Sequence, residues 1–210
     1  LNNVFSNVNF LDISKFDSGP QYIEPTFHFQ KLSYVPNLRL RGYFQSEKYF
    51  MHYVGEIRSL FGPAEKTCQY IREKYPVINK KTIAMHVRRG DYLKFPDVHP
   101  VCSKQYYDDA LKNIAHYKGY NIVICSDDIQ WCRDTFSPDA QIIIGEQDWI
   151  DMYIMSMCTH NIIANSSFSW WGAWLNTNPN KMVIAPKIFL GSARDKVNTK
   201  DIHPDDWKRI

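Results

Sequence analysis

Residues 82–93, TIAMHVRRGDYL, join an apolar run directly to a cluster of charged side chains. The first six residues, 82–87, have the length and composition of a buried β-strand. His86, Arg88, Arg89 and Asp91 follow at or just beyond the end of that strand. Two adjacent guanidinium groups at the end of a buried strand indicate that an anion binds there.

Short apolar runs alternate with helical patterns on the carboxyl side of this strand. The further predicted strands are residues 120–126, 140–145, 161–165 and 181–186. The predicted helices are residues 103–117, 128–136, 148–160 and a helix containing 169–176. We expect Ser103 and Asp148 to cap the helices that they begin. This alternation with continuous apolar strands is typical of a parallel sheet covered by helices on both faces.

The amino-terminal part of the chain has a different pattern. Residues 1–40 show no sustained period and predict strands and loops, whereas residues 50–62 and 64–75 have helical spacing. We therefore predict two regions, a partial amino-terminal domain at residues 1–76 and a Rossmann-like α/β domain at residues 77–210.

Composition excludes several classes of protein. The 210 residues are 44% hydrophobic and 15% aromatic, which allows a packed core and excludes disorder. A net charge of +3 without a basic run does not support nucleic-acid binding. The five cysteines form no C-x-x-C pair, which argues against a structural zinc site and favours reduced thiols.

The sequence contains no apolar run of the roughly 20 residues that span a bilayer. The first 16 residues also lack the pattern of a signal peptide. We expect a cytoplasmic or membrane-associated protein, or a Golgi lumenal one if it is eukaryotic. Any membrane association is expected to involve segments outside this chain.

Polar side chains follow three of the predicted strands, and in a parallel sheet these strand ends share one edge. The first set is His86, Arg88, Arg89 and Asp91; the second is Ser126, Asp127 and Asp128; the third is Asn165, Ser166, Ser167, Phe168 and Ser169. Parallel sheets bind ligands at this edge.

The two arginines point in opposite directions in an extended chain. One is expected to face a ligand, because a guanidinium matches a phosphate or carboxylate bidentately, and the other to face a structural carboxylate such as Asp91. The alternative is an Arg–Asp ion pair that only fixes a turn. His86, beside two cations, is expected to be neutral and hydrogen-bonded, with a simple packing role as its alternative.

The serine-rich third set precedes a predicted helix, whose free N–H groups bind anions. Its alternative role is N-capping by Ser167 or Ser169. Of Asp127 and Asp128, one is expected to cap the next helix, while the other accepts hydrogen bonds from a base such as guanine.

Together these features predict a nucleotide that carries a pyrophosphate. The sequence has neither a GxxxxGK[ST] nor a GxGxxG motif, so ordinary ATPases and dehydrogenases lose support. It also lacks a D-x-D pair for a divalent metal. Arginine and helix-end charge are then expected to stabilise a leaving diphosphate, with no metal and no cofactor.

Three stretches closely resemble the alpha-1,2-fucosyltransferases of glycosyltransferase family 11. They are LRGYFQSEKYF (40–50), HVRRGDY (86–92) and DMYIMSMCTHNIIANSSFSWWGAWLN (151–176). The resemblance implies a GT-B-like architecture, with the parallel sheet as the donor domain. It also implies a metal-independent, inverting transfer of fucose from GDP-fucose to a hydroxyl of a galactose-containing glycan.

The resemblance also implies roles for individual residues. Arg88 would hold the donor diphosphate together with Ser166–Ser169, His86 would lie near the guanosine, and Asp127 or Asp128 would read the guanine. Asp91 is our first candidate for the catalytic base, with pairing to Arg89 as its alternative. Glu146 and Asp148 are weaker candidates for the base.

One family feature is missing from these residues. The family normally has a glycine-rich GLGNQ segment, which does not occur in this sequence. We therefore expect the donor domain with only part of the first domain. The alternative function is a non-catalytic domain that binds a sugar nucleotide or a glycan.

Overall fold

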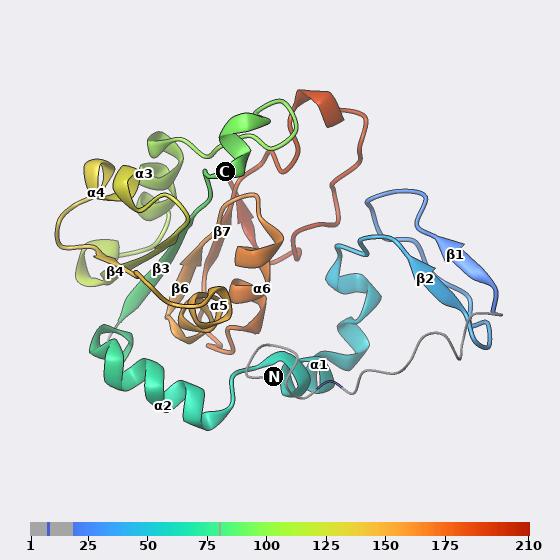
Figure 1. The fold of residues 1–210 in the computed structure, drawn as a ribbon, viewed down its shortest axis with the longest axis horizontal. Coiled ribbons are helices and arrows are strands. Elements are labelled where there is room, and N and C mark those ends of the chain that lie inside the picture. Colours follow the sequence, from blue (N-terminus) through green and yellow to red (C-terminus); the bar gives the residue numbers. More distant parts are fainter. Residues whose placement is uncertain (1–7, 9–18, 80) are drawn as a thin grey trace. The chain divides into compact units, whose positions relative to one another are not determined.

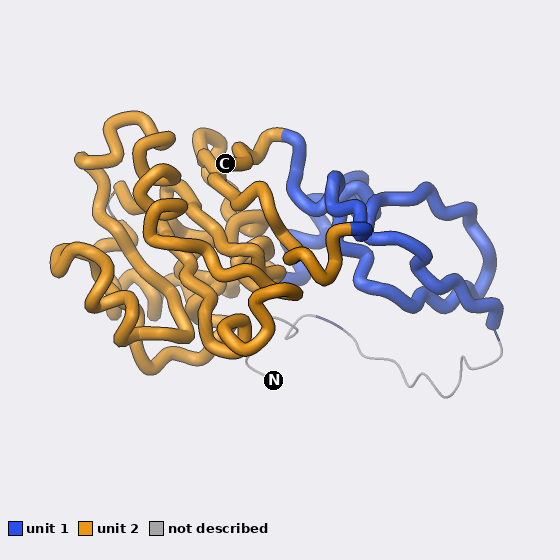
Figure 2. The backbone as a smooth tube through the Cα atoms, turned by 90° about the horizontal axis from the view of Figure 1, so that it is seen from above, with its two compact units in different colours: residues 1–61, 196–205 blue, residues 62–195, 206–210 orange. Residues whose placement is uncertain are grey.

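The structure, a computed structural model, describes residue 8, residues 19–79 and residues 81–210. The chain forms two compact units, coloured separately in Figure 2: Leu1–Phe61 with Lys196–Asp205, and Gly62–Asp195 with Asp206–Ile210. The roles predicted for residues 1–76 and 77–210 stay predictions. The signal-peptide expectation concerns residues 1–16, which lie outside the described residues except for Val8.

The second unit contains a six-stranded parallel sheet. Its strands are β3 (Thr82–Val87), β4 (Asn121–Ser126), β5 (Gln141–Ile142), β6 (His160–Ile162), β7 (Val183–Ala185) and β8 (Lys208–Arg209). They lie in the order β5-β4-β3-β6-β7-β8, and every neighbouring pair is parallel. This confirms the predicted α/β class with a Rossmann-like sheet. The short edge strand β8 was not predicted, because its two exposed basic residues carry no apolar pattern.

Helix α2 (Glu65–Lys74) precedes the first of these strands. The helices between the strands are α3 (Lys104–Lys112), α4 (Ile129–Thr135), α5 (Asp148–Met157) and α6 (Ser167–Leu175). Helices α5 and α6 pack side by side in front of the strands in Figure 1.

All six residues of β3 are buried, which requires cover on both faces of the sheet. Ile83, Met85 and Val87 belong to one core cluster with Tyr107 and Ala110 of α3. The alternate residues of β3 point to the other face, and α5 packs against this strand. A continuous apolar strand therefore takes the centre of the sheet.

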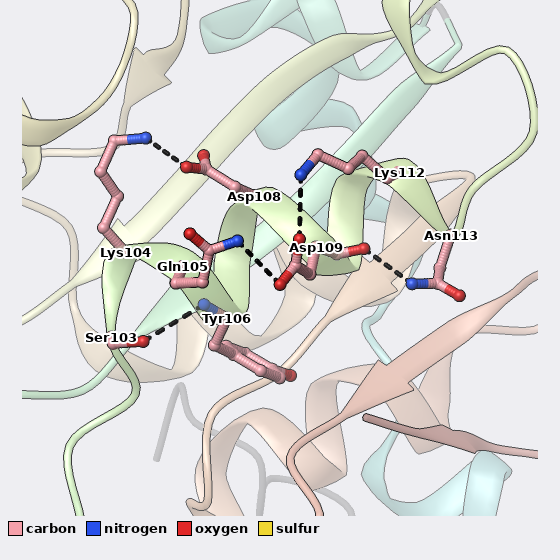
Figure 3. A network of polar contacts seen from close by, with 8 residues as sticks. All are labelled: Ser103, Lys104, Gln105, Tyr106, Asp108, Asp109, Lys112 and Asn113. Atoms are coloured by element: carbon pink, nitrogen blue, oxygen red, sulfur yellow. Dashed lines mark hydrogen bonds and ion pairs between the residues drawn. The ribbon is translucent and has the colours of Figure 1, made fainter.

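Helix α3 shows how the sequence sets a helix boundary. The Ser103 hydroxyl accepts a hydrogen bond from the Tyr106 N–H at 3.3 Å, which confirms the predicted N-cap. The solvent-facing side carries a polar network (Figure 3), formed by the pairs Lys104–Asp108, Gln105–Asp109 and Lys112–Asp109 and by the Asn113 amide on the Asp109 carbonyl. Such exposed pairs each contribute only about 0.2–0.5 kcal/mol, so the buried face of α3 matters more for its stability.

Two other cap predictions were wrong. Gln147 is the N-cap of α5 and forms no side-chain cap bond, while Asp148 is the first residue inside the helix. The N-cap of α6 is Ser166, again without a side-chain cap bond, so neither Ser167 nor Ser169 caps it. In both cases the helix boundary falls one or more residues from the predicted cap.

The first unit has a small parallel sheet of β1 (Gln21–Ile23) and β2 (Arg39–Arg41), followed by helix α1 (Val54–Phe61). Asp201 belongs to this unit. Its carboxylate accepts hydrogen bonds from the Phe29 N–H and from the Lys48 ammonium. The segment 196–205 is therefore tied to residues far earlier in the chain.

All five cysteines are buried and free, as expected for reduced thiols. Among the described residues, no helix is both long enough and apolar enough to cross a bilayer.

Candidate functional site

The strand order creates a topological switch point at the carboxyl end of β3, and we call this edge of the sheet the crevice. The chain runs outward from β3 to β4 and β5, and then returns to place β6 on the other side of β3. The segments that follow β3 and β6 therefore lead to helices on opposite faces of the sheet. Doubly wound sheets bind ligands at such a switch point. The first and third predicted sets of polar residues follow these two strands.

Arg88 lies at this crevice. Its Nη2 atom is 2.5 Å from Asp91 Oδ1, and its Nη1 atom is 3.1 Å from Asp127 Oδ2. The guanidinium carbon lies 5.2 Å from the centre of the Tyr92 ring, and about a third of the side chain, 34%, is exposed. Arg88 is thus held by carboxylates and an aromatic ring but stays accessible to a ligand.

Arg89 has a different environment, as the strand alternation predicted. Its Nε atom donates to Asp128 Oδ2 at 2.9 Å, and its guanidinium carbon lies 4.2 Å from the centre of the Trp131 ring. Asp128 also caps α4 by accepting from the Trp131 N–H at 3.0 Å, which confirms that one of the two aspartates is a cap. The cap bond, and then Arg89, lower the pKa of Asp128. Arg89 therefore anchors α4 to the end of β3.

The pairing predicted between Asp91 and Arg89 was wrong, because Asp91 pairs with Arg88. An alternation rule cannot assign this pair, since the chain leaves the extended conformation at Gly90 and begins a 3-10 turn at Asp91.

Asp127 fixes the turn that carries both arginines. Its carboxylate accepts from the Arg89 N–H at 2.9 Å and pairs with the Arg88 guanidinium. A Cβ atom at Gly90 would lie 2.4 Å from Asp127 Oδ2, so this position has no room for a side chain. The glycine of the RRGD motif is needed for this close approach.

We expect Gly90→Ala to displace the Asp127 carboxylate and to lower the free energy of unfolding by about 1–3 kcal/mol, as overpacking does. It should also weaken ligand binding by Arg88. Urea denaturation measures the first effect. Gly55→Ala in α1 is the control, because a Cβ atom there meets nothing within 4 Å. Equal stability changes in the two variants would contradict this explanation.

His86 is buried, with 5% of its surface exposed. Burial, and then the Arg88 charge, lower its pKa to about 3, which bears out the expectation of a neutral ring. The ring centre lies 5.4 Å from that of Phe168. Its Nδ1 atom has no hydrogen-bond partner within the described part of the chain. The expected hydrogen bond is therefore missing at this atom, and a buried polar atom of this kind is available to a ligand.

The residues after β6 differ in what they offer a ligand. Ser167 is exposed, and the start of α6 lacks a side-chain cap bond. Ser169 is fully buried and donates its hydroxyl to the Ala164 and Ser166 carbonyls. The Asn165 amide is also buried and donates to the Phe189 carbonyl at 3.1 Å. These bonds give Ser169 and Asn165 the structural role of shaping the segment.

Tyr92 joins the two sides of the crevice, although it was not among the predicted site residues. Its hydroxyl donates to the Asn165 carbonyl at 3.2 Å, while its ring lies beneath Arg88 and stacks on His99 at 4.6 Å. Burial raises the pKa of Tyr92, although Arg88 opposes that shift. The signal for Tyr92 was present in the motif, because an aromatic residue next to a guanidinium can form a cation–π contact.

Glu146 and Asp148, the weaker candidates for the catalytic base, form no ion pair with Arg88 or Arg89 within the described residues. Glu146 pairs with Lys74 and accepts hydrogen bonds from the Tyr70 and Tyr75 hydroxyls. Asp148 is an exposed residue in the first turn of α5. Over residues 19–79 and 81–210, no group of three or more histidine, cysteine or acidic side chains is arranged to hold a metal ion.

Comparison with known proteins places this chain in a family. The model of glycosyl transferase family 11 matches residues 2–210. An alpha-1,2-colitosyltransferase of Escherichia coli is 33% identical over 80% of this chain and 61% of its own length. The O-antigen biosynthesis glycosyltransferase WbnK of Escherichia coli is 40% identical over 66% of this chain and 47% of its own length.

A galactoside alpha-(1,2)-fucosyltransferase 1 of Alouatta belzebul is 29% identical over 67% of this chain and 43% of its own length. Among solved structures, the fucosyltransferase NodZ from Bradyrhizobium aligns with a TM-score of 0.45 and 15% identity, over 68% of this chain and 52% of that one. The chain spans between about two fifths and three fifths of the length of these curated relatives. The chain belongs to glycosyl transferase family 11.

Proposed function

We propose that this chain provides the GDP-fucose-binding part of an alpha-1,2-fucosyltransferase. The observation that carries the proposal is the Tyr92 bridge, which holds Arg88 on the same crevice as the start of α6. Family membership and relatives named for alpha-1,2 transfer support the same class of reaction. In this proposal residues 77–210 bind the donor, and residues 1–76 belong to the acceptor side.

The donor diphosphate lies between Arg88 and the first turn of α6. Arg88 exchanges its exposed partner Asp91 for phosphate, which costs little because exposed ion pairs contribute only about 0–1 kcal/mol. The free N–H groups of α6 and the hydroxyls of Ser166 and Ser167 supply the remaining donors. The guanosine lies beside His86 and Phe168, where Nδ1 of the histidine accepts or donates one hydrogen bond.

The guanine is read by one of the two aspartates after β4. Asp127 and Asp128 each have 27% of the side chain exposed, although their oxygens already accept bonds from the arginines and, for Asp128, from the Trp131 N–H. A carboxylate matches the adjacent N–H donors of guanine, which adenine and uracil do not present in the same arrangement.

The transfer is a displacement with inversion at the fucose anomeric carbon. A bond forms from the acceptor hydroxyl oxygen to that carbon, while the bond from the carbon to the phosphate oxygen breaks and GDP leaves with the electron pair. Asp91, released from Arg88, accepts the hydroxyl proton. The acceptor is a galactose-containing glycan.

Arginine charge and the dipole of α6 stabilise the negative charge on the leaving GDP, which is the task that a divalent metal performs in other transferases. Metal independence is therefore part of the proposal. Transfer measured in excess EDTA should equal transfer measured with added Mg²⁺.

Thermal unfolding of the chain with GDP, GMP, UDP and ADP tests the donor site. GDP at about 100 times its dissociation constant should add about 2.7 kcal/mol, or roughly 5–10 °C in Tm for a chain of this size. GMP, UDP and ADP should shift the Tm less. Equal shifts with UDP or ADP would contradict guanine reading, and no shift with GDP would contradict the site itself. A shift with GDP without fucose transfer to N-acetyllactosamine favours the alternative of a non-catalytic binding domain.

A further inference from the structure

A second concave site lies between α2 and the start of α5. It is a cavity of about 450 Å³ whose walls include Lys66, Tyr70, Glu146, Gln147 and Trp149. None of the residues assigned to the donor crevice lines it. Cavities of this size hold small ligands or one segment of a polymer.

One wall of this α2–α5 pocket is held by a buried carboxylate. Only 6% of the Glu146 side chain is exposed, and its Oε1 atom accepts from the Tyr70 and Tyr75 hydroxyls at 3.1 and 2.7 Å. Lys74 pairs with the same carboxylate and donates to the Tyr70 hydroxyl at 2.9 Å. Burial alone would raise the pKa of Glu146, but the bonds from Lys74 and the tyrosines lower it. The Tyr70 ring is therefore fixed in position while remaining exposed.

The pocket is lined by a second aromatic ring that is also held in position. The Trp149 indole N–H donates to Gln147 Oε1 at 2.5 Å, and its ring packs edge-on against Tyr153 with centroids 5.9 Å apart. Gly145 has a positive φ of 77°, and no atom lies within 4 Å of the position that its Cβ would take. Gly145 lines the pocket and adds no side chain to it.

The positive charge of one lysine in the pocket is not balanced by an acidic side chain among the described residues. The charge of Lys74 is balanced by Glu146, whereas Lys66 is exposed and has no ion-pair partner within the described residues. Its three N–H donors are thus free for a ligand. The Gln147 amide adds hydrogen-bonding groups at the same mouth.

These walls match the chemistry of a saccharide. A pyranose ring has one apolar C–H face, which packs on an aromatic ring, and a rim of hydroxyls that need both donors and acceptors. We propose that the α2–α5 pocket binds a saccharide, with the sugar face on Trp149 and its hydroxyls on Gln147 and Lys66. This site lies beyond the proposed donor function and does not depend on it.

Binding of lactose and of glucuronic acid to the whole chain, measured by saturation-transfer NMR and titration calorimetry, tests the proposal. Both probes have a pyranose ring, and only the second adds a carboxylate for Lys66. We expect at least one of them to bind, and Trp149→Ala to weaken that binding at least tenfold. Trp149→Phe keeps an aromatic face and should retain most of the affinity. No binding of either sugar at tens of millimolar would overturn the proposal.

Matched controls separate this site from the donor crevice. Tyr34→Ala removes an aromatic residue that is 90% exposed and lies in the other unit, so saccharide binding should not change. Saturating GDP and the Arg88→Ala variant should also leave saccharide binding unchanged. Loss of binding in either case would place the sugar in the donor crevice and reject the α2–α5 pocket. If Trp149→Ala does not fold, Lys66→Ala and Gln147→Ala replace it, and unchanged affinity in both would count against the proposal.

Discussion

Arg88→Ala is expected to reduce fucose transfer by about 10³-fold, the size of effect seen when a preorganised donor to a developing anion is removed. In the proposed donor site the Arg88 guanidinium holds the diphosphate, and among the described residues no other side-chain cation pairs with both Asp91 and Asp127. The fold should survive, because 34% of the Arg88 side chain is exposed and such ion pairs contribute at most about 1 kcal/mol. Initial rates with GDP-fucose, with Tm measured in parallel, give both quantities.

Arg88→Lys should rescue little of this loss, since an ammonium is a point charge and cannot replace the planar fork. Arg72→Ala provides a matched control, because Arg72 forms an exposed ion pair with Glu65 on α2. A rate for Arg88→Ala within tenfold of the unchanged chain would remove the diphosphate role.

Arg89→Ala is expected to affect stability more than Arg88→Ala does. Arg89 is less exposed, at 18%, and holds both Asp128 and the Trp131 ring. Its loss should lower stability more than the loss of Arg88 does. Loss of Arg88 should thus mainly lower the rate of transfer, whereas loss of Arg89 should mainly lower stability.

Asp151→Asn is expected to stabilise the protein at alkaline pH. Burial, and then the charges of Glu146 and Asp148, raise the pKa of Asp151 to about 7. Its Oδ1 atom is buried without a hydrogen-bond partner among the described residues. The folded chain therefore keeps this carboxyl group protonated at a pH where the unfolded chain has already lost the proton.

The sign of the pH dependence follows from that difference in bound protons. Between about pH 4 and pH 7 the folded state binds more protons at Asp151 than the unfolded state, so this residue makes stability fall as pH rises. Above pH 7 its destabilising contribution is complete, at up to about 4 kcal/mol, because the pKa of Asp151 rises from an ordinary value of about 4 to about 7. Asparagine carries no charge, so the variant lacks this contribution.

Urea denaturation of the parent and the variant at pH 5, 6, 7 and 8 measures the effect as a difference. His86 acts in the opposite direction below its ordinary pKa, because its folded-state pKa of about 3 makes acid favour unfolding. This contribution is common to both proteins and cancels. Asp134→Asn on the exposed surface of α4 is the matched control. A stability difference that does not grow from pH 5 to pH 8 would contradict the buried, protonated state of Asp151.

The parts of the fold that were predicted well are those with a local physical cause. Residues 82–87 form β3 as predicted, because a short and mainly apolar run is typical of a strand buried on both faces. The start of α3 was also predicted, since the Ser103 hydroxyl needs only the N–H three residues later. The neutral state of His86 was predicted from its neighbouring cations, and in the structure burial is the larger cause and the Arg88 charge the second.

The details that were predicted poorly depend on residues far apart in the chain. Asp127 meets Arg88 only because β4 lies beside β3, and Tyr92 meets Asn165 only because β6 lies on the other side. The Asp148 cap failed for a smaller reason, since the helix begins one residue earlier than a simple capping rule assumes. The residue type identified a candidate in each case, but spacing along the chain could not assign its partner.

The sequence alone determined the α/β class, the central strand and the charged side chains at its end, because strand burial and guanidinium charge are properties of neighbouring residues. Only the tertiary structure decided that Arg88 faces the crevice while Arg89 anchors α4, and that Ser169 turns its hydroxyl inward. These orientations depend on which strands lie beside β3. They also depend on Gly90, which has no side chain and so lets the Asp127 carboxylate approach the backbone. Packing between distant segments therefore selects the function of each residue from those that its side chain allows.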